Sequence, residues 1–450
     1  MLVLKFGGTS VGSPEAMQQV VDLAAASTEP GTVLVLSAMA GITNALISGA
    51  EAALKRDLDA ALSRLNEIRS THHRTIKTLF GASPTAEELL NTIDARLDEL
   101  AILYKGVSYL GELTKRSLDA VSGIGELLSS GIVAALAAQK GLPASWVDAR
   151  QFMITDDTFG RANPLWSELT PRTEAAIRPL TDAGRIVFTQ GFIGSTAYGA
   201  STTLGRGGSD FSASIIGVAL NATEIQIWTD VDGMMTADPR VVSDARVIPE
   251  ASFQEASELA YFGAKVLHPL TIKPAVEKNI PVRILNTMRP DQKGTLIKSH
   301  IEATAETIRA VAAKKGITAI FIDSPRMLMA HGFLAKVFAI FERHHTAIDL
   351  ISTSEVSISL TIDDRTNLAE LSADLSEHGE VRIADDLAIV SVVGRQFREQ
   401  NGIAGRVFDT LRDINIVMIS GGASDINLSF VVARADADRA VRQLHAEFFH

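Results

Sequence analysis

Short runs of apolar, β-branched residues alternate with amphipathic segments over the first two thirds of the chain. An apolar run opens the chain, and further runs lie at 32–38, 144–148, 185–193, 224–229 and 281–285. Each run has the length of a buried strand, and the segments between them have the periodicity of helices. Strands that alternate with helices predict an α/β fold, with a mostly parallel sheet between layers of helices.

The pattern changes between residues 45 and 139, where Ala, Leu, Glu, Arg and Lys predominate and long helices are expected. The sequence Ala-Ser-Pro-Thr at 82–85, followed by acidic residues, predicts the start of one of them. His72 and His73 are adjacent in this region. Such a pair suggests a metal site, but neighbouring side chains on a helix point apart, so we interpret the pair as part of a solvated face.

The last third of the chain contains an internal repeat with an offset of 70 residues. Gly332, Val337, Phe338 and Phe341 recur as Gly402, Val407, Phe408 and Leu411, and the segment 354–360 recurs as 424–430. Each copy has the pattern of half a ferredoxin-like unit, so two small α+β modules are expected. We predict a large domain at 1–293, a linker at 294–307, and modules at 308–385 and 386–450.

Composition narrows the class of protein. The 450 residues exceed what one hydrophobic core usually serves. The absence of cysteine excludes a disulfide scaffold and thiolate catalysis, and the densest apolar run, at 131–138, is too short to cross a membrane. A net charge of -11 argues against nucleic acid or anionic membrane as a partner. A cytoplasmic enzyme is expected.

The first strand ends in a pattern suited to a polyanion. Lys5 is followed by Gly7 and Gly8 and then by two hydroxyl residues, Thr9 and Ser10. A lysine supplies a compact positive charge, and glycines let backbone N–H groups approach phosphate closely. The order differs from a Walker A loop, in which the lysine follows the glycines. A plain strand-to-helix turn is the alternative.

Two further segments have candidate chemistry. Arg206 lies among glycines just before Ser209, which we expect to cap a helix that runs to Leu220, with Asp210 in its first turn. An arginine there is suited to clamp a carboxylate or phosphate, and a plain capped helix is the alternative. An acidic turn at 228–240 follows a strand, which is a common and mostly solvated arrangement.

Five motifs together carry a resemblance to a known family. They lie at 5–10, 36–44, 205–210, 228–240 and 262–269, and the second of them has the sequence Leu-Ser-Ala-Met-Ala-Gly-Ile-Thr-Asn. In this order they resemble the aspartokinases, enzymes of the amino acid kinase fold, and the repeats resemble the two C-terminal ACT modules of that family. The chain stops after the second repeat, so it resembles a monofunctional member without a homoserine dehydrogenase extension.

The resemblance implies ATP-dependent phosphorylation of the side-chain carboxylate of L-aspartate, the first step towards lysine, threonine and methionine. It assigns catalytic roles to Lys5, Gly7, Gly8 and Asp210. Lys5 would neutralise the transferring phosphoryl group, the Gly7 and Gly8 amides would hold its oxygens, and Asp210 would orient Lys5. A general base is not needed, because the attacking carboxylate is already ionised.

The resemblance also implies contacts to aspartate and ATP. Arg206 would clamp the α-carboxylate and Glu126 would bind the ammonium, although Glu126 by itself has the pattern of a helix-surface carboxylate. The remaining contacts to aspartate would come from Ser37, Thr43 and Ser209. The implied contacts to ATP are Lys5, Gly8, Thr229, Asp230, Met235 and Lys265. Mg²⁺ would bridge the ATP phosphates, and no metal site made by the protein alone is expected. Met235 would lie beside the adenine, where relatives often have an aromatic residue.

The first repeat resembles that of lysine-inhibited aspartokinases. Asp349 would receive the ammonium of an effector, and Ser354 would take its carboxylate. The alternative is that Asp349 and Ser354 only end a strand and form a turn. Met329-Ala330 stands where relatives often have a polar residue, so threonine or no effector are alternatives to lysine. The implied effector contacts are Met327, Ala330, Gly332, Phe333, Ile348, Asp349 and Ser354. Pairing of the strand at 357–362 between chains would make a homodimer, or a tetramer.

Two other classes stay open. One is a different amino acid kinase, acting on glutamate, carbamate or a nucleotide. The other is a catalytically silent sensor that binds amino acids through its repeats.

Overall fold

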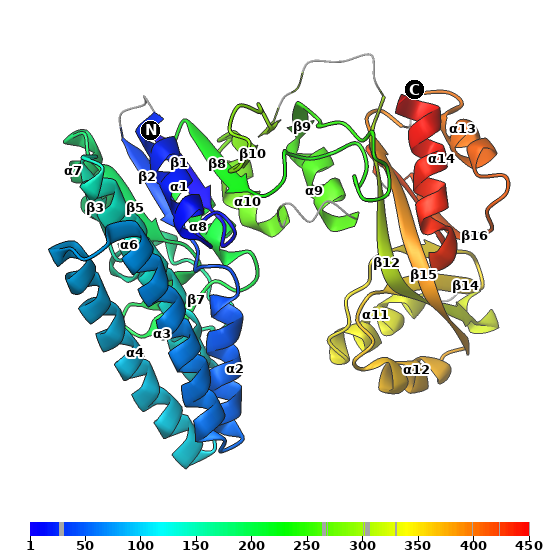
Figure 1. Cartoon of the computed structure of the whole chain (residues 1–450). Coiled ribbons are helices and arrows are strands. Elements are labelled where there is room, and N and C mark those ends of the chain that lie inside the picture. The colour runs from blue at the N-terminus through cyan, green and yellow to red at the C-terminus, as the bar shows by residue number, and fades with distance from the viewer. Residues whose placement is uncertain are drawn as a thin grey trace. The chain divides into compact units, whose positions relative to one another are not determined.

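The computed structural model describes residues 1–26, 31–262, 267, 269–299, 301, 307–328, 331–397, 399–422 and 424–449 (Figure 1). The described chain divides into two compact units. The first contains residues 1–234, 249–253 and 266–301, and the second contains 235–248, 254–265 and 302–450.

The described residues of the first unit include an eight-stranded sheet with the order β3-β5-β2-β1-β8-β10-β11-β9. Within it, β10 and β11 pair antiparallel, and the other neighbouring strands are parallel. The predicted α/β fold with a mostly parallel sheet is therefore confirmed. The strands are β1 Leu2–Phe6, β2 Thr32–Leu36, β3 Ala144–Trp146, β5 Ile186–Gln190, β8 Glu224–Thr229, β9 Glu250–Ser252, β10 Val282–Asn286 and β11 Thr295–Lys298.

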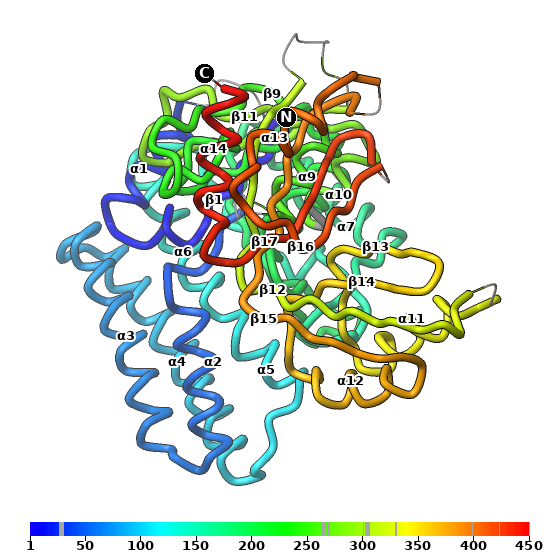
Figure 2. The backbone as a smooth tube through the Cα atoms, turned by 90° about the vertical axis from the view of Figure 1, so that its right-hand side faces the viewer, coloured from blue at the N-terminus to red at the C-terminus, as the bar shows by residue number. Residues whose placement is uncertain are grey.

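The helices of the first unit surround this sheet and extend beyond it. The long helices α2, α3 and α4 run side by side as a bundle in both views (Figures 1 and 2). Helix α4 begins as predicted, because the Ser83 side chain accepts a hydrogen bond from the Ala86 amide. The helices are α1 Pro14–Ala26, α2 Ile42–Leu54, α3 Leu58–Phe80, α4 Pro84–Leu110, α5 Lys115–Ser122, α6 Ile124–Gln139, α7 Trp166–Asp182, α8 Gly208–Ala219 and α10 Pro269–Glu277.

The first unit also contains a small second sheet, which the sequence pattern did not predict. Among the described residues it has the order β4-β6-β7, with β4 at Ile154–Thr155, β6 at Ile193–Thr196 and β7 at Ser201–Thr203. β6 and β7 pair antiparallel, with Ile193 opposite Thr203. This hairpin delivers the chain directly into the glycine-rich segment that contains Arg206.

The histidine pair does not lie on a solvated face. His72 is fully buried, its ring contacts the Ile68 carbonyl, and burial lowers the pKa of its imidazole to about 4. That part of the prediction is wrong, because the face of α3 that contains His72 packs into the bundle. His73 is partly exposed and contacts Asp94. No group of three metal-binding side chains occurs among the residues that the structure describes.

The segment Lys115–Gln139, which contains α5 and α6, is long and apolar enough to cross a membrane. However, 78% of its most apolar window is buried inside the protein. Its apolar composition is explained by its position as a core element of the first unit.

In the second unit, the described strands form a six-stranded sheet with the order β13-β14-β12-β15-β17-β16. The long strands β12 and β15 lie side by side and antiparallel, and each runs through both halves of the sheet (Figures 1 and 2). The strands are β12 Ile308–Asp323, β13 Ile351–Thr353, β14 Ser357–Ile362, β15 Glu380–Gly394, β16 Ile416–Gly421 and β17 Asn427–Ala433. The helices are α9 Phe253–Phe262, α11 Phe333–Arg343, α12 Leu368–Ser376, α13 Ile403–Thr410 and α14 Ala437–Phe449.

Each half of this sheet has its own core, which confirms the internal repeat. One core joins α11 and α12 to Ile320 and Ile358, and the other joins α13 and α14 to Val390 and Phe430. The repeated glycines, Gly332 and Gly402, occupy equivalent N-cap positions of α11 and α13 with φ values of 77° and 84°. Glycine adopts such values without strain.

One boundary and one strand position differ from the sequence predictions. β11 falls inside the expected linker 294–307 but pairs with β10, so the first unit continues to residue 301. The strand at 357–362 is not an edge, because β14 pairs with both β12 and β13. Hydrophobic alternation indicates that one face of a strand is buried, but it does not reveal how many neighbours the strand has.

Candidate active site

Three parallel strands of the first unit end at the same level. Phe6 at the end of β1 lies opposite both Leu36 of β2 and Trp228 of β8. The residues that follow these strands therefore meet at the carboxyl edge of the sheet, which is where open α/β sheets bind their ligands.

Lys5 and Asp210 form an ion pair at this edge. The Lys5 Nζ lies 2.6 Å from the Asp210 Oδ1, and both side chains are almost completely buried. Asp210 lies in the first turn of α8, as predicted. The predicted cap is wrong, because Gly207, with φ of 71°, occupies the N-cap position instead of Ser209. The left-handed conformation of Gly207 turns the chain sharply into α8 and directs Asp210 towards β1.

The loop after β1 packs closely against the loop after β2. The Ala40 amide donates a hydrogen bond to the Gly8 carbonyl, and a Cβ added to Gly8 would lie only 2.9 Å from the Ala38 carbonyl oxygen. This approach requires glycine. The Gly7 amide already donates to the Trp228 carbonyl at 3.2 Å, so of the two predicted phosphate donors it is engaged within the sheet.

A chain of hydrogen bonds connects α8 and α6 through the loop after β2. The Ser37 Oγ donates to the Ser209 Oγ at 2.9 Å, and the Ser129 Oγ donates to the Ser37 carbonyl at 2.7 Å. Thr43 lies half-buried in the first turn of α2, and Arg206 is exposed before α8. The structure thus brings Ser37 and Ser209 together with Lys5 and Asp210, although 172 residues separate the two serines.

Glu126 is the most unusual titratable group of this region. It is 3% exposed in the first turn of α6. Burial raises the pKa of its carboxyl to about 8, against the opposing effect of a hydrogen bond from the Ala38 backbone. Among the described residues, the Glu126 Oε2 has no hydrogen-bond partner. A buried carboxyl group with an open oxygen is suited to receive a cationic group of a ligand.

The acidic turn follows β8 at the same carboxyl edge of the sheet. Thr229 is half-buried and donates a hydrogen bond to the exposed Asp230 at 3.2 Å. Asp232 accepts a hydrogen bond from Asn286 at 2.6 Å. The Ser10 hydroxyl lies 2.7 Å from the Thr287 hydroxyl, which links the first loop to the end of β10. The sequence analysis did not select Asn286 and Thr287, although their position directly after a predicted strand was the signal that could have found them.

Two of the predicted nucleotide contacts, Lys265 and Met235, are not among the described residues of the first unit. Lys265 lies outside the described residues. Met235 is half-buried and forms an antiparallel bridge with Val247, in a segment that folds with the second unit.

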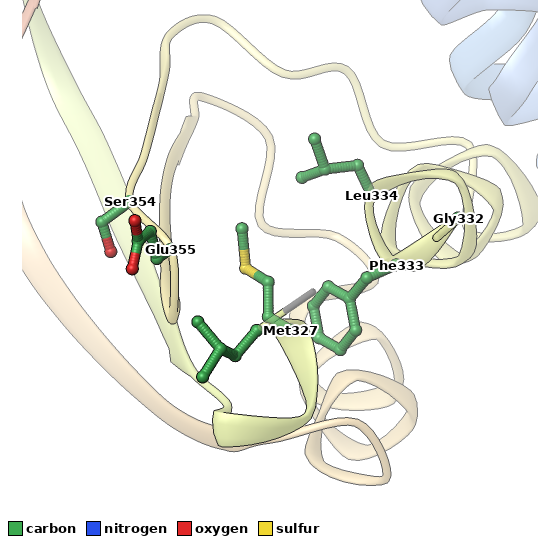
Figure 3. Close-up of a pocket in the computed structure, with 7 residues that line it drawn as sticks. Met327, Gly332, Phe333, Leu334, Ser354 and Glu355 are labelled. Carbon is green, nitrogen blue, oxygen red and sulfur yellow. The ribbon is translucent and has the colours of Figure 1, made fainter. Parts of the chain in front are cut away.

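A pocket in the second unit gathers most of the predicted effector contacts (Figure 3). Its volume is about 560 Å³, and in Figure 3 the sulfur of Met327 and the ring of Phe333 face the turn that contains Ser354 and Glu355. Of the predicted contacts, Ala330 lies outside the described residues. The pocket is lined by Met327, Leu328, Gly332, Phe333, Leu334, Ser354 and Glu355.

Asp349 is engaged elsewhere. Its carboxylate accepts hydrogen bonds from the Lys314 Nζ at 2.7 Å and from the Tyr261 hydroxyl. Lys314 also lies 2.8 Å from Asp363. The Asp349 side chain is only 2% exposed, and its Oδ2 has no partner within the described ranges. Ile348 packs against the core below α11 and α12.

Comparison with known proteins agrees with this fold. The model of the amino acid kinase family matches residues 1–286, and that of an ACT domain matches 390–448. The lysine-sensitive aspartokinase 3 of Escherichia coli (strain K12) is 38% identical over 458 residues, which covers 100% of this chain and 99% of that protein. The chloroplastic aspartokinase 1 of Arabidopsis thaliana is 38% identical over 99% of this chain and 80% of its own length.

Solved structures give the same result. The E. coli aspartokinase III in complex with aspartate and ADP, in the R-state, superposes with a TM-score of 0.85 at 37% identity over the whole of both chains. The same enzyme with lysine and aspartate, in the T-state, has a TM-score of 0.83. The fold is therefore that of an amino acid kinase. The chain belongs to the amino acid kinase family, within its aspartokinase branch.

Proposed function

We propose that the protein is an ATP-dependent aspartate kinase that transfers the γ-phosphoryl group to the side-chain carboxylate of L-aspartate. The products are 4-phospho-L-aspartate and ADP. The observation that carries the proposal is the buried Lys5–Asp210 pair beside the close-packed Gly8 loop, with the open Glu126 carboxyl on the same edge. Both the fixed cation for a phosphoryl group and the acceptor for an amino group are present.

Catalysis in this site is electrostatic and positional. Asp210 holds the ammonium of Lys5 in place before the substrate binds, so no reorganisation is needed when charge develops on the transferring group. The Gly8 loop lets ATP phosphates approach the backbone closely. The attacking carboxylate of aspartate is ionised at neutral pH, so the site requires no general base.

The amino acid end of aspartate is bound by charges of opposite sign. The planar fork of Arg206 pairs with the α-carboxylate, and Glu126 becomes ionised as it receives the α-ammonium. Ser37, Thr43 and Ser209 complete the site with hydrogen bonds. The buried position of Glu126 makes the ammonium contact strong, because few waters compete for it.

On the acidic-turn side of the first unit, Thr229 and Asp230 are the proposed nucleotide contacts. Lys265 and Met235 are further contacts that only the resemblance to the aspartokinases implies. Mg²⁺ fits this arrangement as a companion of the nucleotide. The exposed Asp230 carboxylate is the candidate protein ligand, and phosphate oxygens of the nucleotide would supply further oxygen ligands. Mg²⁺ supplies neutralisation of the β- and γ-phosphate charge.

A coupled assay of ADP release tests the proposed function with L-aspartate, L-glutamate and N-acetylglutamate as acceptors. Aspartate is expected to be the preferred substrate by a wide margin in kcat/KM. Preference for glutamate or acetylglutamate would assign the protein to another amino acid kinase activity. Amino acid binding without ADP release would identify a silent sensor.

The second unit supports regulation by lysine. The pocket at Met327, Phe333 and Ser354 has the size of an amino acid site, and the E. coli relative has been solved with lysine. Asp349 does not line this pocket. It is the buried carboxylate that the resemblance assigns to an effector ammonium, and the Lys314 ammonium already pairs with it. An effector lysine must therefore compete with Lys314 for this carboxylate.

This competition predicts opposite effects for two substitutions. Asp349→Ala is expected to abolish lysine inhibition with little change in activity without lysine. Lys314→Met is expected to lower the concentration of lysine for half-inhibition several-fold, since it frees the carboxylate. Titration of lysine against the rate measures both. Lys315→Met, which removes the neighbouring pair with Asp438, is the matched control. Unchanged inhibition in both test variants would exclude Asp349 from the effector site.

We also infer a homodimer that forms through the second unit. The two outermost strands of the described sheet are β13 and β16, and the Ser420 hydroxyl of β16 donates a hydrogen bond to the Ile351 carbonyl of β13. These strands are the candidates for pairing between chains. Sedimentation of the full chain over a range of concentrations measures the assembly.

A further inference from the structure

Asp119 is a buried carboxylate of α5 that the reaction scheme does not use. It is 2% exposed, which is a costly position for a charge unless its oxygens are hydrogen-bonded. Its Oδ1 accepts a hydrogen bond from the Thr203 hydroxyl at 2.7 Å. Its Oδ2 accepts from the amides of Thr203 and Gly160, at 3.0 Å and 2.9 Å. Three donors from two separate segments, the end of β7 and the loop at Gly160, therefore converge on one side chain.

These donors control the path of the chain towards Arg206. Thr203 is the last residue of β7, and its carbonyl accepts a hydrogen bond from the Ala162 amide, so it is held from both sides. Gly205 follows with φ of 79° and packs so tightly that an added Cβ would lie 3.1 Å from the Gly160 carbonyl oxygen. Asp119 thus binds Gly160, which is one partner of this contact, and Thr203, which lies two residues before the other partner, Gly205.

The other end of the same element controls Glu126. Gly123 alone separates α5 from α6, and Glu126 lies in the first turn of α6. A Cβ added to Gly123 would lie 2.7 Å from the Ile193 Cγ2, so the junction packs directly on β6. Since β6 pairs with β7 opposite Thr203, the helix junction and the Arg206 loop rest on one hairpin.

We propose that Asp119 is a positioning residue that fixes the distance between the Arg206 guanidinium and the Glu126 carboxyl, and so sets the affinity for the α-amino acid end of the substrate. It acts through Thr203 and Gly160 without contact to the substrate. The inference rests on the proposed function, in which Arg206 and Glu126 bind the α-carboxylate and α-ammonium. A shift of either partner by a fraction of an ångström weakens the pairing with a substrate whose two charges have a fixed separation.

Asp119→Ala tests this role because it leaves the three donors without an acceptor. The KM for aspartate is expected to rise about tenfold or more, with the KM for ATP and kcat changed by less than about threefold. Asp119→Asn should restore most of the affinity, since its amide oxygen can accept from both N–H groups and its NH₂ can donate to the Thr203 hydroxyl. Thr203→Val removes one hydrogen bond and should raise the same KM by a smaller factor.

The control separates positioning from stability. Tyr104→Phe removes a buried hydrogen bond to the Leu46 carbonyl in the helical bundle, and is expected to leave both KM values unchanged. A double mutant of Asp119→Ala with Arg206→Lys should be less impaired than the two separate effects predict, because both act on one contact.

The outcomes distinguish this inference from the function on which it rests. A wild-type chain that does not phosphorylate aspartate contradicts the proposed function. If the wild type is active and Asp119→Ala lowers kcat with an unchanged aspartate KM, only the positioning role is overturned. If Asp119→Ala does not fold, an unchanged aspartate KM in Thr203→Val overturns that role in the same way.

Discussion

Lys5→Ala is expected to lower kcat by about three orders of magnitude, which is the scale lost when one preorganised charge on a transition state is removed. The Lys5 ammonium is held 2.6 Å from Asp210 at the edge where phosphate is expected to bind. Water cannot replace it, because the pair is almost fully buried and a solvent molecule has no fixed charge. The KM values are expected to change much less than kcat, since the interaction strengthens as the phosphoryl group moves.

Steady-state kinetics with a check of folding measures this effect. Loss of Lys5 leaves the buried Asp210 without its cation, so the double variant Lys5→Met with Asp210→Asn serves to separate catalysis from stability. It should fold more stably than Lys5→Ala and be equally inactive. Lys140→Ala, which removes an exposed pair with Asp22, is the matched lysine control and should retain full activity. Retention of more than a tenth of kcat in Lys5→Ala would rule out the proposed role.

The second prediction concerns Glu126 and pH. Burial raises the pKa of its carboxyl to about 8, so the group is mostly protonated in the free protein at pH 7. The substrate ammonium favours the ionised form, and aspartate binding must therefore release a proton below pH 8. The aspartate KM is expected to fall as pH rises from 6 to 8, by up to about tenfold per pH unit, and to level off above 8.

Glu126→Gln removes both the charge and its titration. The aspartate KM is expected to rise by about two orders of magnitude at pH 8 and to lose its dependence on pH, because a neutral amide cannot pair with the ammonium. Calorimetry in buffers of different ionisation enthalpy measures the released proton directly at pH 7. Glu224→Gln, at the opposite end of β8 and paired with Arg283, is the matched control and should keep the wild-type profile. A wild-type KM that is flat from pH 6 to 8 would contradict the shifted Glu126.

The local sequence pattern was sufficient to predict many of the strands, turns and helix starts of this molecule. Lys5 in an apolar run that is followed by glycines predicted a strand that ends in a loop, and β1 ends there, because a strand and its turn are encoded by neighbouring residues. The repeat of Gly332 as Gly402 predicted two equivalent modules, and both glycines adopt the left-handed conformation at the starts of equivalent helices. Ser83 predicted the start of α4 for the same reason, since a cap is a contact over three residues.

The tertiary structure decided what local pattern does not encode. Glu126 has the sequence pattern of an exposed helix residue, and only the packing of α6 against the loop after β2 buries it and makes it a candidate ammonium site. Ser37 meets Ser209 across 172 residues, and Asp119 meets Thr203 across 84. Periodicity shows which face of an element is buried, but not which distant element packs on that face. Strand order and loop packing supply that information, and they therefore determine the pKa of Glu126, the partner of Asp349 and the place of Asp119.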